Sequence, residues 1–360
     1  MNSPARRSGL APVRLTPKFV ERIWGARDLR PLFSKKIPKK DHPIGEVWMT
    51  GDDCEFATGE FAGRKLGEVW PALSSECTGT SLSGLPRIPL LVKFIFPKEK
   101  LSVQVHPGDD YARRNEAAAG GVGKTEMWYV VSARPRASVR VGLRPEVTRE
   151  SFAAAIAKGG VEKLLRAIPL HPGEAVFVPA GTTHTICPGL VLCEIQQHSD
   201  ITYRVFDYNR LGPDGKPREL HLQKALEVID FGGSATTGGG LCDPVRVRCG
   251  EVTETFYAAC RYFAAECWEF RERIDAAASS EHFELLIVLK GRGRIQFTGG
   301  AESFGPADVW FMPAALGAYR LAPTFPAMLL RAYVPNLNCF SRQLADKHIP
   351  EAEWSRVVHR

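Results

Sequence analysis

Four polar side chains have the types and the spacing that a metal site needs. Gln104 and His106 lie two residues apart in LSVQVHP, Glu126 opens the apolar run EMWYVV, and His184 follows a Pro-Ala-Gly turn. Two imidazoles, a carboxylate and an amide oxygen are ligands for Zn²⁺ or another first-row divalent metal. A single histidine in a strand is usually a core residue, but the whole set is much less expected by accident. The pattern therefore favours a metal site.

These residues lie in segments whose patterns predict β-strands. In 101–107, the polar side chains of Ser102, Gln104 and His106 alternate with apolar ones, which places all three on one face of a strand. The preceding apolar run PLLVKFIF is typical of a buried strand. The same reasoning predicts further strands over 125–132, 173–181, 183–186, 190–196 and 201–208.

Two later segments repeat the pattern of earlier ones. ELLIVL, which begins at Glu284, is similar to EMWYVV at Glu126, and PADVWFMP is similar to PGEAVFVP. We therefore predict two related β-barrels in tandem, joined by the glycine-rich stretch 232–240. Aligning the copies places Ala318 opposite His184, so the second copy is expected to hold no metal.

The two predicted domains differ in content. Residues 1–240 form the metal-binding domain, with helical insertions over about 148–168, where Thr148 is the N-cap, and over 219–231. Residues 241–360 form a second, metal-free β-domain. A mainly β chain agrees with the 33 glycines and 26 prolines among 360 residues, which favour many turns.

The composition excludes several classes of protein. The chain is 44% hydrophobic and 24% charged, as globular proteins are. A net charge of +7 favours anionic partners, but the cluster at 35–40 is too short for a nucleic-acid-binding stripe. Nine cysteines without a CxxC pair are typical of a reducing compartment. With no signal peptide and no apolar stretch of about 18 residues, we expect a cytoplasmic protein that has no membrane partner.

Long motifs resemble those of the type I phosphomannose isomerase family, in its short bacterial form. In the family's order they are IWGARDL, IGEVW, VKFIFPKEKLSVQVHP, GKTEMWYV, VPAGTTHTI and CEIQQHSDITYRVFDYNR. The resemblance runs through about residues 12–231. It implies a cupin fold of two tandem jelly-roll (double-stranded β-helix) barrels and one zinc ion per chain. It also implies an isomerase that interconverts mannose 6-phosphate and fructose 6-phosphate.

The resemblance also assigns roles by motif position. The zinc ligands are Gln104, His106, Glu126 and His184. The catalytic residues are Lys124, Glu194, Asp200 and Arg204, and the phosphate-binding residues are Lys93 and Ser102. His198 departs from the family, which usually has Asn there, and this puts the hydrogen bonding around Asp200 in question.

Aldose–ketose isomerisation explains these residue types. A proton leaves the carbon next to a carbonyl and returns to the neighbouring carbon, and a metal can stabilise the intervening enediolate. Lys124, close to the metal, and Glu194, on a strand face, are both candidates for the base. We favour Lys124 slightly, with Glu194 orienting or shuttling the proton. Arg204 lies in mid-strand, so it needs Asp200, Asp207 or an anionic substrate as its partner.

Two other function classes fit part of the pattern. Two histidines and a carboxylate also match a non-haem Fe(II) oxygenase, although Gln104 and Lys124 argue against the open coordination positions of such enzymes. A non-catalytic sugar-phosphate sensor would use the same scaffold, but its catalytic positions would be eroded, and here all but His198 are filled. The sequence leaves open the range of sugars and whether the chain is a monomer or a homodimer.

Overall fold

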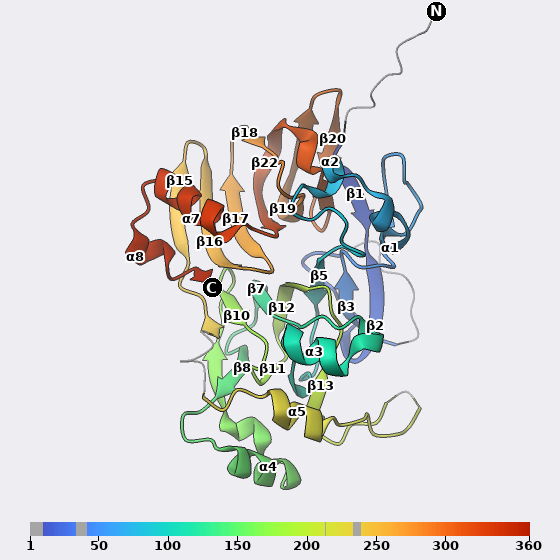
Figure 1. The fold of residues 1–360 in the computed structure, drawn as a ribbon, viewed down its shortest axis with the longest axis vertical. Helices are drawn as coiled ribbons and strands as arrows, with labels where there is room; N and C mark the ends of the chain where they lie inside the picture. The colour runs from blue at the N-terminus through green and yellow to red at the C-terminus, as the bar shows by residue number, and fades with distance from the viewer. Residues whose placement is uncertain (1–9, 34–41, 213, 233–238) are drawn as a thin grey trace, which may run out of the picture.

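Strands dominate the computed structural model, which describes residues 10–33, 42–212, 214–232 and 239–360. The mainly β fold class is confirmed. Figure 1 shows two groups of strands, with the green strands of the first half below and the orange and red strands of the second half above. The basic cluster at 35–40 and most of the glycine-rich stretch 232–240 lie outside the described residues.

Two antiparallel sheets face each other in the first half. Trp128 and Val178 of one sheet pack against Val139 and Ile186 of the other. The seven-stranded sheet has the order β14-β10-β7-β12-β5-β3-β2, with β2 Lys18–Ala26, β3 Ile44–Trp48, β5 Leu90–Ile95, β7 Glu126–Ala133, β10 Ala175–Val178, β12 Leu190–Gln197 and β14 Gly240–Leu241. The five-stranded sheet has the order β13-β6-β11-β8-β9, with β6 Val103–Val105, β8 Ser138–Leu143, β9 Leu165–Pro169, β11 His184–Ile186 and β13 Tyr203–Phe206.

The third sheet joins strands from both ends of the chain. Its main path is β15-β16-β17-β22-β19-β21-β1-β4. Its members are β1 Val13–Thr16, β4 Glu55–Phe56, β15 Val245–Cys249, β16 Val252–Cys260, β17 Ala264–Phe270, β18 Ile274–Ala277, β19 Glu284–Phe297, β20 Gly300–Phe304, β21 Val309–Met312, β22 Ala318–Tyr333 and β23 Val358–His359. Val13 of β1 lies opposite Phe311 of β21. The division of the chain at residue 240 stays a prediction. Strand β1, from the first half of the sequence, belongs to the sheet that the second half forms.

The two halves share a strand-pairing register. Glu126 lies opposite Val178 in β7–β10, and Glu284 lies opposite Met312 in β19–β21. A proline follows each of these partners in the sequence. The internal similarity read from the sequence therefore corresponds to equivalent strand pairs.

Buried charges of opposite sign occupy matching positions in the two halves. Glu194 of β12 lies opposite Lys93 of β5, whereas Arg331 of β22 lies opposite Glu266 of β17. The Arg331 guanidinium donates from Nε to Glu284 Oε2 at 2.9 Å and from Nη1 to Glu266 Oε1 at 2.6 Å. In the second half, the Arg331 guanidinium therefore lies between the two buried carboxylates of Glu266 and Glu284.

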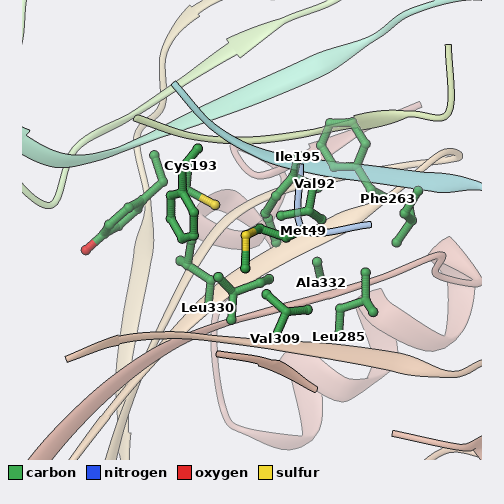
Figure 2. Close-up of a cluster of buried hydrophobic side chains, with 14 of the residues drawn as sticks. Met49, Val92, Cys193, Ile195, Phe263, Leu285, Val309, Leu330 and Ala332 are labelled. Carbon is green, nitrogen blue, oxygen red and sulfur yellow. The ribbon is translucent and has the colours of Figure 1, made fainter. Parts of the chain in front are cut away.

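One apolar core runs between the two halves. Figure 2 shows Met49, Val92 and Ile195 of the first half beside Leu285 and Leu330 of the second. All five side chains are fully buried. Burying a side chain of this size contributes about 1.5–3 kcal/mol, so this shared core is a major source of stability.

Short helices lie outside the sheets. They are α1 Leu66–Val69, α2 Ser75–Thr78, α3 Asp109–Asn115, α4 Arg149–Ala157, α5 Leu222–Val228, α7 Leu337–Asp346 and α8 Glu351–Trp354, with 3₁₀ turns η1 Trp70–Ala72, η2 Ala117–Ala119, η3 Val161–Leu164 and η4 Ala314–Leu316. Thr148 caps α4 through a reciprocal hydrogen-bond pair with Ser151. The prediction of helix to residue 168 is wrong, because Leu165 turns to extended backbone and starts β9 beside β8. Among the described helices, none is long and apolar enough to cross a membrane.

Candidate metal centre and active site

Two rows of polar side chains face each other between the sheets of the first half. On the five-stranded sheet, Gln104 of β6 lies opposite both His184 of β11 and Arg204 of β13. On the seven-stranded sheet, Glu194 of β12 lies opposite Lys93 of β5. Residues directly opposite in neighbouring strands share a face, so each pairing register brings its residues together.

Three ligand-type side chains cluster at the centre. His106 Nε2 lies 3.6 Å from Glu126 Oε2, and His184 Nε2 lies 3.3 Å from Glu126 Oε1. The three potential ligand atoms lie within 4.8 Å of one another, and all three residues are at most 1% exposed. His106 Nε2 and both Glu126 oxygens are buried without a hydrogen bond in the described structure. Such atoms are costly to bury, so the set fits a bound cation.

The two histidines present the nitrogen that a metal needs. His106 Nδ1 lies 2.8 Å from the Ile201 carbonyl, and His184 Nδ1 lies 2.9 Å from the Thr182 carbonyl. A carbonyl only accepts, so each Nδ1 carries the hydrogen and each Nε2 keeps a free lone pair. Burial lowers the pKa of His184 to about 4 and that of His106 well below its usual value, with Lys124 adding to both effects. Both rings are therefore neutral at pH 7.

Gln104 stands beside this cluster. Its Nε2 lies 3.2 Å from His184 Nε2, while its Oε1 accepts from Ser102 Oγ at 3.1 Å. A half-turn of the amide would exchange the two atoms and present Oε1 to the cluster. The Ser102 hydroxyl could then accept from the amide instead, because a hydroxyl both donates and accepts.

A cavity of about 540 Å³ opens next to the cluster. The cavity is lined by all six residues predicted for catalysis or phosphate binding, which are Lys93, Ser102, Lys124, Glu194, Asp200 and Arg204. Gln104 also lines it. Lys124 connects the cavity to the cluster, because its Nζ lies 3.2 Å from Glu126 Oε2. The structure thus brings the predicted site residues together.

The acid–base properties of two cavity residues differ from the sequence expectation. Burial, reinforced by Glu126, raises the pKa of Glu194 to about 7, although Lys124 and Lys93 oppose the shift. Burial would lower the pKa of Lys124, but Glu126, Glu194 and Asp200 outweigh burial and raise it above the usual lysine value. A bound divalent cation would act on Lys124 in the opposite sense. From the protein's own charges, Glu194 is the group that titrates near neutrality.

Arg204 has an unsatisfied guanidinium. Its Nη1 donates to the Glu219 carbonyl at 2.8 Å, but its Nε is buried without a hydrogen bond. Asp207 binds Arg218 and Arg210 instead, with Arg218 Nε donating to Oδ2 at 2.7 Å. Neither aspartate foreseen as a partner forms a described salt bridge with Arg204, which leaves an anionic substrate as the remaining expectation.

Several cavity residues were missed by the sequence reasoning, among them Arg22, Glu46 and Arg218. Glu46 accepts from Trp48 Nε1 at 2.7 Å and pairs with Arg22 at 2.9 Å. Burial would raise the pKa of Glu46, but Lys93 and Arg22 lower it to about 2. The motif IGEVW pointed to Glu46 without giving it a role, whereas no sequence pattern pointed to Arg218.

His198, the departure from the family motif, lies away from this cavity. Its Nδ1 donates to the Ile88 carbonyl at 2.7 Å, and it lines a separate cavity of about 740 Å³. The sequence had put the hydrogen bonding around Asp200 in question because of His198. No described hydrogen bond joins the two side chains, and the Asp200 carboxylate lies 3.7 Å from Lys93 Nζ instead.

Comparisons with known proteins agree with this geometry. Residues 13–126 match the family described as phosphomannose isomerase type I, catalytic domain. The chain is 34% identical over 325 residues to the probable mannose-6-phosphate isomerase GmuF of Bacillus subtilis, covering 88% of this chain and 98% of that protein. It is 32% identical over 320 residues to the mannose-6-phosphate isomerase ManA of the same organism, covering 86% and 95%.

The chain belongs to the type I phosphomannose isomerase family.

Solved structures of the family share the fold. The mannose 6-phosphate isomerase of Bacillus subtilis superposes with a TM-score of 0.80 at 31% identity, covering 90% of this chain and 99% of that one. A phosphomannose isomerase of Salmonella typhimurium gives 0.71 at 16% identity, covering 90% and 100%, and shows the fold alone. The predicted type I phosphomannose isomerase family and the prediction that the chain is an enzyme are confirmed.

Proposed function

We propose that this phosphomannose isomerase interconverts mannose 6-phosphate and fructose 6-phosphate with one bound zinc ion. The observation that carries the proposal is the buried His106–Glu126–His184 cluster, with unsatisfied ligand atoms, next to a cavity rich in charged groups. Gln104 is the fourth proposed ligand. When bound, zinc would supply positive charge that stabilises an enediolate oxygen.

Glu194 is the base in this proposal. It is buried at 5% exposure, lines the cavity, and has a pKa of about 7, so much of it is ionised at neutral pH. Trp128 Nε1 donates to its Oε1 at 3.1 Å and fixes its direction. Glu194 takes the proton from C2 of the aldose and returns it to C1, while the proton of the C2 hydroxyl passes to O1, so that C2 becomes the carbonyl and C1 carries the hydroxyl. The slight preference for Lys124 as the base is therefore not kept.

Lys124 and Arg204 stabilise negative charge. With a raised pKa, Lys124 is an ammonium group that donates hydrogen bonds to the reacting oxygens. Arg204, with Arg218 on the same cavity wall, binds the phosphate, and Ser102 adds a hydroxyl. Lys93 lies 3.7 Å from both Glu194 and Asp200, so it is better assigned to holding these carboxylates than to the phosphate. Asp200, at the cavity, assists ring opening.

The cellular setting that we propose is the cytoplasm. The nine cysteines are all unpaired, which supports a reducing compartment.

The test of the proposed function is an assay that couples fructose 6-phosphate formation to a dye, run on metal-free and zinc-restored protein with mannose 6-phosphate. Activity is expected only with the metal. Equal activity without metal would contradict the zinc assignment, and Fe(II)-dependent oxygen uptake in place of isomerisation would contradict the reaction.

A further inference from the structure

A half-buried hydrogen-bond junction lies outside the cavity, on the carboxylate of Asp109 at the start of α3. Its Oδ1 accepts from the backbone N–H of Gly123 at 2.9 Å and from Gln197 Nε2 at 3.0 Å. Its Oδ2 accepts from the Tyr262 hydroxyl at 2.8 Å and from Arg261 Nη2 at 2.9 Å. Four donors from three separate segments thus converge on one side chain that is 17% exposed.

Two of these bonds hold the backbone on both sides of Lys124. Gly123 directly precedes it, and the oxygen of Gln197 accepts from the N–H of Thr125, which directly follows it, at 2.8 Å. A Cβ on Gly123 would lie 2.6 Å from the Asp109 nitrogen, so only glycine allows this approach. Asp109 thus holds the residues on both sides of Lys124, while the N–H of Lys124 itself donates to the Pro107 carbonyl at 3.0 Å.

The other two bonds come from the second half of the chain. Arg261 and Tyr262 form the turn between β16 and β17. The Arg261 side chain is 68% exposed, so its ion pair is screened by solvent and contributes little. The Tyr262 hydroxyl is half-buried, so its bond to Asp109 is better shielded from solvent. This bond is also stronger than one between neutral groups, because the acceptor is a carboxylate.

We propose that Asp109 is a positioning residue through which the 261–262 turn fixes the backbone of Lys124 and Glu126. The proposal rests on the proposed function, because the positioned residues belong to that site. Through this contact the second half of the chain would influence the reaction, although none of its residues lines the cavity in the described structure. Groups that orient metal ligands and their neighbours typically change metal affinity or activity roughly 10- to 100-fold when removed.

The test compares two tyrosine-to-phenylalanine changes. Tyr262→Phe removes the bond to Asp109. Tyr257→Phe removes a second hydroxyl bond between the halves, from Tyr257 of β16 to the Gly173 carbonyl at 2.7 Å, which leads to no cavity residue. Both variants lose one buried hydroxyl bond across the same boundary, so both are expected to lower Tm by a similar amount.

The deciding readouts are amide exchange and the separation of kcat from KM. In Tyr262→Phe, the amides of Gly123 and Thr125 should exchange faster in metal-free and zinc-loaded protein alike, and kcat should fall by about 2- to 10-fold with KM nearly unchanged. In Tyr257→Phe, both should match the parent chain. Asp109→Asn should give the larger effect, roughly 10- to 100-fold in kcat, with the same exchange pattern.

Two results would overturn the proposal. One is parental amide exchange at Gly123 and Thr125 in Tyr262→Phe and Asp109→Asn. The other is equal loss of kcat in Tyr262→Phe and Tyr257→Phe, which would show a general loss of stability. Amide exchange is measured without substrate. If the protein had no isomerase activity, the proposed function would be refuted, and the exchange rates alone would still test the positioning role of Asp109.

Discussion

At the scale of single residues, Glu194 and Lys124 share a cavity but differ in how their surroundings shift their proton affinity. The pKa of Glu194 is raised to about 7 in the metal-free chain, partly by Glu126, and a zinc ion on Glu126 would lower it. We therefore expect kcat of the zinc-loaded enzyme to increase along an ascending limb below pH 7. Glu194→Gln should lower kcat about 10²- to 10⁴-fold, the usual loss for a general base, and remove that limb.

Solvent-deuterium exchange at C2 of the sugar checks this prediction. Lys124→Met serves as the comparison, because it removes the ammonium group and keeps the carboxylate. It should slow turnover yet retain exchange at C2. If Lys124→Met abolishes exchange while Glu194→Gln keeps the parental rate, the base is Lys124.

Arg204→Lys tests the proposed phosphate-binding role of Arg204. A lysine keeps the charge but loses the planar fork that pairs with a phosphate through two hydrogen bonds. Losing one charge-assisted bond costs about 1.5–3 kcal/mol, so kcat/KM should fall roughly 10- to 100-fold while zinc content and Tm stay the same. Near-parental turnover would mean that Arg204 has only a structural role.

Proton binding by the two cluster histidines makes stability depend on pH. Burial lowers the pKa of His184 from 6.5 to about 4, so the unfolded chain takes up its proton first as the pH falls. The metal-free protein should therefore lose about 3 kcal/mol from this residue between pH 6.5 and 4, and keep it above pH 6.5. Chemical denaturation at several pH values measures this loss. His184→Gln should flatten the dependence, whereas His171→Gln, at an exposed position, should leave it unchanged.

At the scale of elements, strand periodicity predicted more than helical spacing did. The alternation read over 101–107 placed Ser102 and Gln104 on one face, and both line the cavity, although β6 itself covers only Val103–Val105. The helix predicted through residue 168 failed because Leu165 is fully buried and pairs with β8, and this tertiary pairing outweighs local spacing.

The candidate site was predictable only in part, because registers between distant strands leave no local pattern. Nothing in the sequence sets Arg204 opposite Gln104. Glu46 was missed for a similar reason, since its ion-pair partner Arg22 lies on another strand and no local pattern joins the two. Arg218 was missed because its bond to Asp207 spans a loop that has no regular pattern. The individual roles came from a family resemblance and remain predictions until variants are measured.

The ion network of the second half gives a prediction about β22. Arg331→Met leaves Glu284 and Glu266 buried without their guanidinium, and losing one partner of a buried pair costs about 3–5 kcal/mol. The control is Arg320→Met on the same strand, whose bond to Asp275 is exposed, with an expected cost of about 0–1 kcal/mol. Equal Tm values for the two variants would contradict the assigned role.

At the scale of the whole molecule, the two halves share a core and a hydrogen-bond junction, so the half that holds the candidate site is not packed independently of the other. Met49 and Val92 pack against Leu285 and Leu330 in one apolar cluster. A change at Leu330 should therefore destabilise the half that holds the site. Leu330→Ala, which leaves a cavity, is expected to cost about 2–5 kcal/mol, visible as a lower denaturant midpoint for zinc-dependent activity and for global fluorescence together.

The pairing of β1 with β21 also constrains how the molecule is made. Val13–Thr16 leaves the ribosome long before Val309–Met312 does. The large sheet therefore cannot close until β21 has been made, and until then the edge of β1 that will pair with β21 is open to any neighbouring nascent chain. Yield on expression should thus be sensitive to translation speed and chaperone supply, and supplying the N-terminal strand in trans should rescue a chain that lacks it.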